Sequence, residues 1–283
     1  MTDVGYQVKE YLTTGAGTEG SLLIEKTIHN ELIKAVDKKL IPRELAAINV
    51  GAGGVKGSSY DIDLETANSA TVFQIAEGAA VPISTPTFTS VNVKPAKYGA
   101  RPLITKEMLE DGKWDLLGFS IERSGKEIAE NESSLVITAL DGAANTVAGG
   151  AAITIANITR AIQHLEDADF TATDMLCGPE VANDLRNIDT FVEADKFGSR
   201  EMMERGLVGK IYNMNIWVIS SSVITSTSAY VFDRTQAYAI VEKRPVTTAR
   251  FSDMIHDLEG ATVTQRLAVS LLRSSAVAKI TTS

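Results

Sequence analysis

The longest regular pattern of apolar and polar residues in the chain runs from Trp114 to Val147 and predicts one long helix. Apolar residues recur along it at three- and four-residue spacing, at Leu117, Ile121, Ile128, Leu135, Val136, Ala139, Leu140 and Ala143. Opposite charges stand four residues apart on the other side, as at Glu122 and Lys126. At 1.5 Å per residue such a helix would span roughly 50 Å. Two interpretations are open: an ordinary core helix, or a spine from which separate lobes extend.

The part before position 58 combines a polar tail, a helix and a glycine-rich run. Residues 1–20 hold little that a core could bury, so they are expected to become ordered only against another surface. A helix is predicted from Leu22 to Lys39, with Lys26, Lys34, Lys38 and Lys39 on its polar side. The run 51–57 lacks the third glycine of a dinucleotide fingerprint and the Gly-Lys-Ser/Thr of a P-loop, so a hinge is favoured there.

Residues 58–94 have the period-two pattern of extended chain. Tyr60, Ile62 and Leu64 alternate with acidic residues, which predicts a half-buried strand. Thr71–Ala76 is predicted to be the returning strand of a hairpin, and Phe88–Lys94 a third extended run. An isolated hairpin with one apolar face is marginal in water and needs a partner surface. Another copy of the chain is one candidate, which makes six residues candidates for intersubunit contact: Tyr60, Ile62, Leu64, Val72, Phe73 and Ile75.

After the long helix the pattern alternates between helices and strands, as in an α/β lobe. Helices are predicted at 158–166 and from Gly178-Pro179 to Arg186, and strands at 174–177, 216–220, 229–233 and 238–242. Three later extended runs, 246–251, 261–273 and 276–282, are expected to pair with strands that precede the long helix.

Composition and charge exclude several classes of protein. The chain of 283 residues is 44% hydrophobic and 22% charged, as in a globular protein. Its net charge of -9 argues against a nucleic-acid binder, and no apolar run is long enough to span a membrane. The single cysteine, Cys177, lies in an apolar run and is expected to be buried and inert.

No arrangement of side chains in the sequence indicates catalysis. The three histidines, His29, His164 and His256, lie in different segments without a ligand-like pattern, and the pair Asp61 and Asp63 lacks further calcium ligands. We therefore expect no enzyme activity, no cofactor and no metal, and a protein whose work is assembly.

The order of the segments resembles that of major capsid proteins of tailed bacterial and archaeal viruses, which share the Hong Kong 97 fold. The resemblance lies in Glu77–Pro82, the strand Phe88–Lys94, Ile104–Asp111 with the long helix, Leu207–Ile211, and the strands at 216–220, 229–234 and 238–244. It implies an α+β fold with an N-terminal arm (1–20), a first helix and hinge (21–54) and an extended hairpin loop (55–85). A peripheral domain with a spine helix (86–148 and 244–283) and an α/β axial domain (149–243) complete it.

The resemblance also implies a function. It predicts a self-assembling icosahedral shell of pentamers and hexamers in the virion, built in the host cytoplasm around double-stranded DNA bound without sequence specificity. A portal, and a separate scaffold or decoration protein, would be its partners, and no membrane is involved. An encapsulin-like compartment shell and an unrecognised α/β enzyme are the alternatives. Some family members cross-link a loop lysine to a neighbour's asparagine, but residues 57–93 contain no lysine and residues 244–283 no asparagine, so non-covalent contacts are expected.

Overall fold

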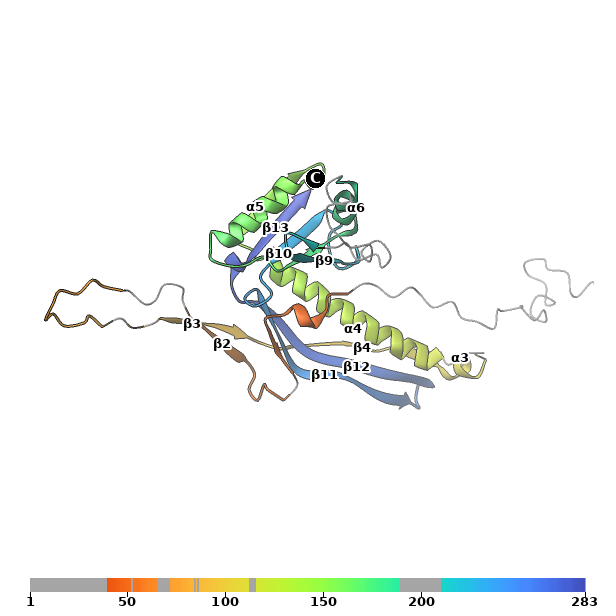
Figure 1. Cartoon of the computed structure of the whole chain (residues 1–283). Coiled ribbons are helices and arrows are strands. Elements are labelled where there is room, and N and C mark those ends of the chain that lie inside the picture. The colour runs from red at the N-terminus through yellow and green to blue at the C-terminus, as the bar shows by residue number, and fades with distance from the viewer. Residues whose placement is uncertain are drawn as a thin grey trace, which may run out of the picture. The chain divides into compact units, whose positions relative to one another are not determined.

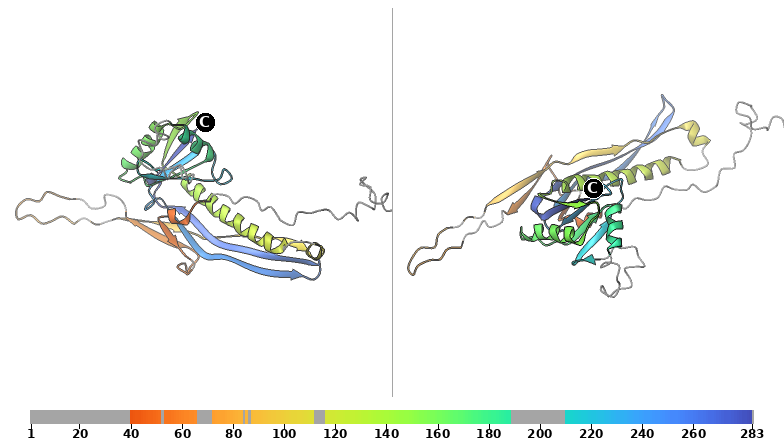
Figure 2. Two further views of the ribbon diagram at one scale, coloured as in Figure 1. Left: turned by 45° about the vertical axis from the view of Figure 1, so that its right-hand side comes forward. Right: turned by 90° about the horizontal axis from the view of Figure 1, so that it is seen from above.

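The computed structural model describes residues 40–51, 53–65, 72–83, 85, 87–111, 116–188 and 210–282 (Figures 1 and 2). The helices within these ranges are α3 (Lys106–Glu110), α4 (Leu116–Leu140), α5 (Ile155–Glu166) and α6 (Pro179–Asn187), with short 3-10 turns η1 (Arg43–Leu45) and η2 (Ser274–Ala276). The predicted N-terminal arm and the whole of the helix predicted from Leu22 to Lys39 lie outside the described residues.

The strands form three sheets, so the predicted α+β class is confirmed. One sheet has the order β1-β11-β12-β4, with β5 also paired to β12; these strands are β1 (Ile48–Val50), β4 (Ala96–Ala100), β5 (Leu103–Thr105), β11 (Tyr238–Asp253) and β12 (Leu258–Leu271). A second sheet has the order β6-β13-β10-β7-β9-β8, from β6 (Asn145–Gly150), β7 (Asp174–Cys177), β8 (Lys210–Ile211), β9 (Met214–Val218), β10 (Ser228–Phe232) and β13 (Val277–Thr282). The third is the pair β2 (Tyr60–Glu65) and β3 (Phe88–Val93).

The long helix is confirmed, but it is shorter than its apolar period predicts. It ends at Leu140, where the amide of Gly142 donates to the carbonyl of Ala139 in a turn. A side chain at Gly142 would lie 3.1 Å from Leu271 Cδ2, so the small residue fits the close approach of β12. Val147, predicted to lie in the helix, belongs to β6 and pairs in parallel with Ile280 of β13.

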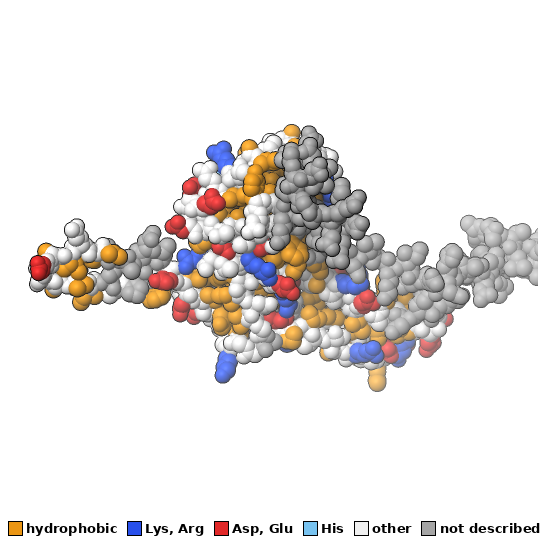
Figure 3. Space-filling model, viewed as in Figure 1, with side chains coloured by type: hydrophobic (Ala, Val, Ile, Leu, Met, Phe, Trp, Pro, Cys, Tyr) orange, Lys and Arg blue, Asp and Glu red, His pale blue; other side chains and the backbone are white. Residues whose placement is uncertain are grey.

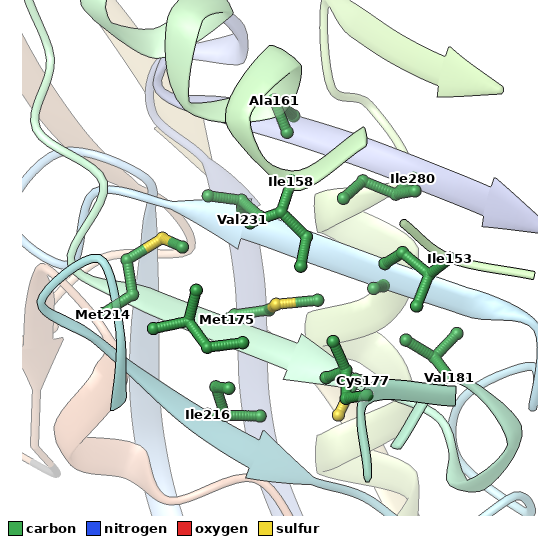
Figure 4. Close-up of a cluster of buried hydrophobic side chains, with 14 of the residues drawn as sticks. Ile153, Ile158, Ala161, Met175, Cys177, Val181, Met214, Ile216, Val231 and Ile280 are labelled. Carbon is green, nitrogen blue, oxygen red and sulfur yellow. The ribbon is translucent and has the colours of Figure 1, made fainter. Parts of the chain in front are cut away.

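The six-stranded sheet carries the largest apolar cluster of the described chain. Helix α5 packs Ile158, Ala161 and Leu165 against it, and Thr154 caps that helix by accepting from the amide of Asn157. Figure 4 shows Ile158 and Ala161 of the helix over Val231 and Ile280 of the strands. All four residues of β7 are buried, as in a central strand covered on both faces, and the carboxylate of Asp174 at its start accepts from Trp217 Nε1 over 3.0 Å.

Two expected strand pairings are wrong. The segment 72–76 forms no strand, and β2 pairs antiparallel with β3, from Tyr60 opposite Val93 to Glu65 opposite Phe88. Strand β13 pairs with β10 and β6, which follow the long helix, while β12 pairs with β4 and β5 as expected. A period of two identifies the buried face of a strand but carries no information about its neighbour. The final strand, β13, therefore lies in the sheet of the α/β lobe. Its residues fall outside the range 149–243 that was predicted for the axial domain.

Candidate assembly surface

The apolar face of β2 packs against its own chain. Ile62 is 5% exposed and lies in a cluster with Val93, Val241 and Leu272, against which Tyr60 and Leu64 also pack. The expectation that Ile62 contacts an adjacent copy is therefore corrected, because the strands β11 and β3 already cover it. The need of this face for a partner surface is met within the subunit.

Six of the twelve exposed large apolar side chains of the described residues instead lie between Val72 and Phe88, the first residue of β3. Large apolar residues of this segment are exposed as follows: Val72 96%, Phe73 46%, Ile75 39%, Val81 73%, Ile83 91% and Phe88 65%. We call these six residues the apolar loop; residues 72–83 lie at the left of Figure 3, where orange side chains gather. Residues 72–83 form neither helix nor strand. Three of the six, Val72, Phe73 and Ile75, were predicted from sequence as contact residues.

A turn at Ala76–Ala79 presents the one charge of residues 72–83. The amide of Ala79 donates to the carbonyl of Ala76 over 3.0 Å, and Gly78 has φ of 80°, the left-handed value that a type II turn needs at its third residue. Glu77 occupies the second position and is exposed. The turn therefore offers a carboxylate amid apolar side chains.

Hydrogen bonds hold the root of the apolar loop to the subunit. Arg273 Nη2 donates to the carbonyl oxygen of Glu65, the last residue of β2, over 2.6 Å. The side chains of Asn92 and Asp61 join β3 to β2. The loop therefore begins and ends at a fixed place on its own subunit.

A buried polar cluster joins four distant segments next to this region. Arg43 Nε and Nη2 donate to the two carboxylate oxygens of Glu132 on α4, both over 2.5 Å, and its Nη1 donates to Glu242 of β11 over 3.0 Å. Gln265 of β12 is fully buried and donates to both carboxylates. Burial acts to raise the pKa of the Glu242 carboxyl, but the hydrogen bonds from Arg43 and Gln265 outweigh it and lower that pKa overall.

A second polar contact ties the end of α4 to the six-stranded sheet. Asp141 accepts from Tyr230 Oη over 2.6 Å and from Lys279 Nζ over 2.7 Å. Burial raises the pKa of the Asp141 carboxyl, yet these two donors lower it overall, while burial raises the pKa of the Tyr230 hydroxyl. Both polar clusters link segments that are distant in the sequence.

The described residues contain no group of three or more side chains that could hold a metal ion. Cys177 is buried, and burial raises the pKa of its thiol to about 12, so the side chain is inert as expected. His256 is exposed and pairs with Asp253 over 2.9 Å in the turn between β11 and β12. No helix of the described part is long and apolar enough to cross a membrane. Lys26, Lys34, Lys38 and Lys39 lie outside the described residues.

Sequence reasoning missed half of the apolar loop. Val81, Ile83 and Phe88 follow no regular period and are interrupted by Pro82 and Pro86, so no element was predicted for the first two. A usable signal was present, because residues 72–83 contain four large aliphatic residues and only one charge without any helical or strand pattern. Such a segment cannot bury its own side chains.

Comparison with solved structures shows capsid proteins of similar fold. A protein of Mycobacterium phage Che8 matches with a TM-score of 0.74 and 14% identity, over 91% of this chain and 96% of that one. The capsid of the cyanophage P-SCSP1u matches with a TM-score of 0.75 and 14% identity, over 100% and 99% of the two chains. The capsid of a native GTA particle matches with a TM-score of 0.69 and 16% identity, over 96% and 99%.

Comparison with protein families gives a direct assignment. No curated protein sequence matches the chain. The model of the phage capsid family matches residues 20–282, which is nearly the whole chain. An exposed apolar loop fits a protein that works by joining copies of itself. The chain belongs to the phage capsid family, and it is a structural capsid protein of the virion.

Proposed function

We propose that the protein assembles into an icosahedral shell of pentamers and hexamers, held by non-covalent contacts in which the apolar loop of each subunit packs on a neighbour. The observation that supports this most directly is the exposure of six large apolar side chains in one segment. Monomeric proteins rarely expose so many neighbouring apolar groups, and a contiguous apolar patch marks an interaction site.

The apolar loop supplies a large part of the energy that assembly needs. Fully burying a Val, Ile or Phe side chain contributes about 1.5–3 kcal/mol. Even partial burial of the six side chains therefore gives several kcal/mol per contact, against an association cost of similar size. In a closed shell each subunit both gives and receives such a contact, so weak individual contacts add up to a stable particle.

The remaining parts of the proposal concern the contents and partners of the shell. The shell encloses double-stranded DNA, which a chain of net charge -9 contacts weakly and without sequence preference. Lys26, Lys34, Lys38 and Lys39 are the proposed DNA-facing residues. A portal and a separate scaffold or decoration protein complete the particle, which is assembled in the host cytoplasm. No observation favours the encapsulin-like shell or the α/β enzyme.

Electron microscopy of the purified protein tests the proposal. The wild type should form closed shells, whereas Ile83→Asp and Val72→Asp should give folded subunits that do not assemble, because each places a charge in the contact. Ala156→Asp is the matched control, since Ala156 is exposed in the first turn of α5, where a carboxylate favours the helix. Normal shells from the double variant Val72→Asp/Ile83→Asp would overturn the role of the loop. A monodisperse wild-type monomer under all assembly conditions would overturn the shell itself.

A further inference from the structure

The sheet of β4, β12 and β11 has one covered face and one partly open face. Val263, Gln265 and Leu267 of β12 are buried, and Gln265 contacts Glu132 of α4. Because successive strand residues point to opposite faces, the even-numbered residues of β12 lie on the face away from α4. Near the root of the apolar loop this second face is covered, since Ala268 packs in the cluster that holds Ile62.

Beyond that covered part, three cations lie side by side across the open face. Arg244 of β11 is the register partner of Arg266 of β12, and Arg266 is the register partner of Lys97 of β4. We call Arg244, Arg266 and Lys97 the cation row. With strands about 4.8 Å apart, the row extends roughly 10 Å across the sheet. Like charges directly opposite each other on neighbouring strands are destabilising, so this arrangement needs a compensating anion.

The described part of the chain does not supply that anion. Arg244 Nη2 donates to Thr264 Oγ1 over 2.8 Å, and Arg266 Nη2 donates to the carbonyl of Pro95 over 3.4 Å. No carboxylate among the described residues forms an ion pair with any member of the cation row. Arg244 Nε is buried and has no hydrogen-bond partner. That buried N–H is closed to a group from outside, but three neighbouring cations without a paired carboxylate favour an anionic group from outside the subunit.

We propose that the cation row receives the Glu77 carboxylate from the loop of a second copy of this chain. The inference rests on the proposed function, in which that loop packs on a neighbour, and it names the place where the loop binds. Glu77 is the one charge of residues 72–83 and lies in an exposed turn, so a loop on an apolar surface alone would leave it without a partner. A carboxylate matches the fork of a guanidinium, which fixes the position of the loop as well as holding it.

The row of residues next to the cation row is uncharged and has small side chains, so apolar side chains of the loop can pack on it. It consists of Thr247, Thr264 and Gly99, which are register partners and carry small side chains. A Cβ atom at Gly99 would lie 2.7 Å from Thr264 Cγ2, so Thr264 already fills the space beside this glycine. The surface has no protruding side chain at Gly99.

Nucleic acid is the competing occupant, and the charge pattern disfavours it. A surface that binds a polyanion needs basic residues spread along the path of the phosphates. Here the three cations form a single short row, and the rows beside it on the open face are uncharged, with Thr247 and Thr264 on one side and Ala268 on the other. A single carboxylate in an otherwise apolar loop matches this surface better than a row of phosphates.

A charge exchange tests the pairing. Glu77→Arg and Lys97→Glu should each raise the protein concentration needed for assembly about tenfold, because attraction becomes repulsion at every contact. The double variant Glu77→Arg/Lys97→Glu should restore most of the assembly, because it puts opposite charges back at the contact. If either residue had only a structural role in its own subunit, the double variant would not restore assembly. Arg266→Glu, with and without Glu77→Arg, repeats the test at the centre of the row. Glu166→Arg and Arg160→Glu, both exposed on α5, are the controls and should assemble normally.

The outcomes separate this inference from the proposed function. If Ile83→Asp blocks assembly but the double exchange restores nothing, the loop binds elsewhere and the cation row is not its receptor. If Lys97→Glu shells form normally but lose their nucleic acid, the row binds phosphate and the inference is wrong. If Ile83→Asp itself assembles normally, the proposed role of the loop fails first.

A disulfide scan gives an independent measurement on assembled particles. In Glu77→Cys/Lys97→Cys, an added mild oxidant should take two electrons and two protons from a thiol pair at each contact. Multimers should then run on a non-reducing denaturing gel and collapse to one band with reductant. Each single variant should stay monomeric, since Cys177 is buried. A double variant that also stays monomeric, in shells of normal appearance, would place the two residues apart.

Discussion

Arg43 and Glu132 lie 89 positions apart in the sequence and are joined by two hydrogen bonds of 2.5 Å, in which the whole carboxylate faces the guanidinium fork. The same guanidinium contacts Glu242. Two carboxylates with side-chain exposures of 11% and 9% therefore share one cation, whose own side chain is 38% exposed. Among the described residues, the two negative charges are thus offset by one arginine and by hydrogen bonds from the amide of Gln265.

The first prediction follows from that imbalance. Arg43→Met leaves two buried carboxylates facing each other and should lower the free energy of unfolding by about 3 kcal/mol, the lower end of the range for a broken buried pair, because the arginine is partly exposed. Glu132→Gln should cost less, since Arg43 and Glu242 remain paired. Chemical denaturation of the unassembled subunit measures both. Equal losses from the two variants would mean that the second carboxylate adds nothing.

The pH dependence of the first variant has a definite sign. In the wild type the pKa of Glu242 is lowered, so its contribution is present above the ordinary carboxyl pKa and is lost as the pH falls through the lowered value. In Arg43→Met the pKa of Glu242 should be raised, because burial remains while the hydrogen bond from Arg43 is lost, so Glu242 takes up a proton on acidification. The stability difference between wild type and variant should therefore shrink as the pH falls from 7 toward about 4. A difference that stays constant over that range would contradict the assignment.

A second prediction separates the two faces of the segment around β2 and β3. Ile62→Asp buries a carboxylate in the subunit's own core and should cost several kcal/mol of stability, leaving little folded protein. Ile83→Asp changes a side chain that is 91% exposed and should leave the free energy of unfolding of the unassembled subunit within about 0.5 kcal/mol of wild type. Thermal unfolding monitored by circular dichroism distinguishes them. A folded, stable Ile62→Asp subunit would show that this face does not hold the subunit together.

The contrast between Ile62 and Ile83 shows how far the sequence was informative. Alternation at Tyr60, Ile62 and Leu64 correctly predicted a strand with one buried face, because side chains of a strand alternate. It could not say that β11 and β3 cover this face, since pairing between distant strands depends on the whole fold. The exposed contact residues have no period at all, because nothing in their own subunit imposes one.

The same limit applies to the polar sites. The two ends of the Arg43–Glu132 pair are unremarkable charged residues in the sequence, and only the packing of η1 on α4 brings them together. The cation row likewise depends on the register of three strands, two of which follow residue 237 while the third precedes residue 101. By contrast, α5, α6 and β7 were predicted nearly to their ends, since local periodicity and the Gly178-Pro179 start define them.

A third prediction concerns the lysines before Pro42. Reversing the charge of Lys26, Lys34, Lys38 and Lys39 together should reduce the DNA retained in purified particles more than it reduces the number of particles, because lysines contact phosphates without sequence preference. Retained DNA can be measured after nuclease treatment, alongside particle counts by electron microscopy. Loss of the shells themselves would assign these lysines to protein contacts instead.

The last prediction concerns covalent cross-links between subunits. A lysine amine that attacks an amide must first lose its proton, which requires an apolar pocket and a nearby base. Residues 57–93 contain no lysine, and residues 244–283 contain no asparagine. Lys56 and Lys94 flank the root of the apolar loop, because Tyr60 and Val93 are paired there, so neither is carried outward with the exposed residues 72–83.

Assembled particles should therefore separate completely into single chains under denaturing conditions. Particles boiled in detergent and reductant should run on a gel as one band at the chain mass of 30.3 kDa. The non-covalent contacts that replace the cross-link bury apolar surface. The denaturant concentration that dissociates the particles into subunits should therefore rise with the apolar area of the loop. Ile83→Val, which removes one methylene, should lower that concentration slightly without changing the single band. A ladder of multimers that survives denaturant and reductant would show that a different pair of residues forms the bond.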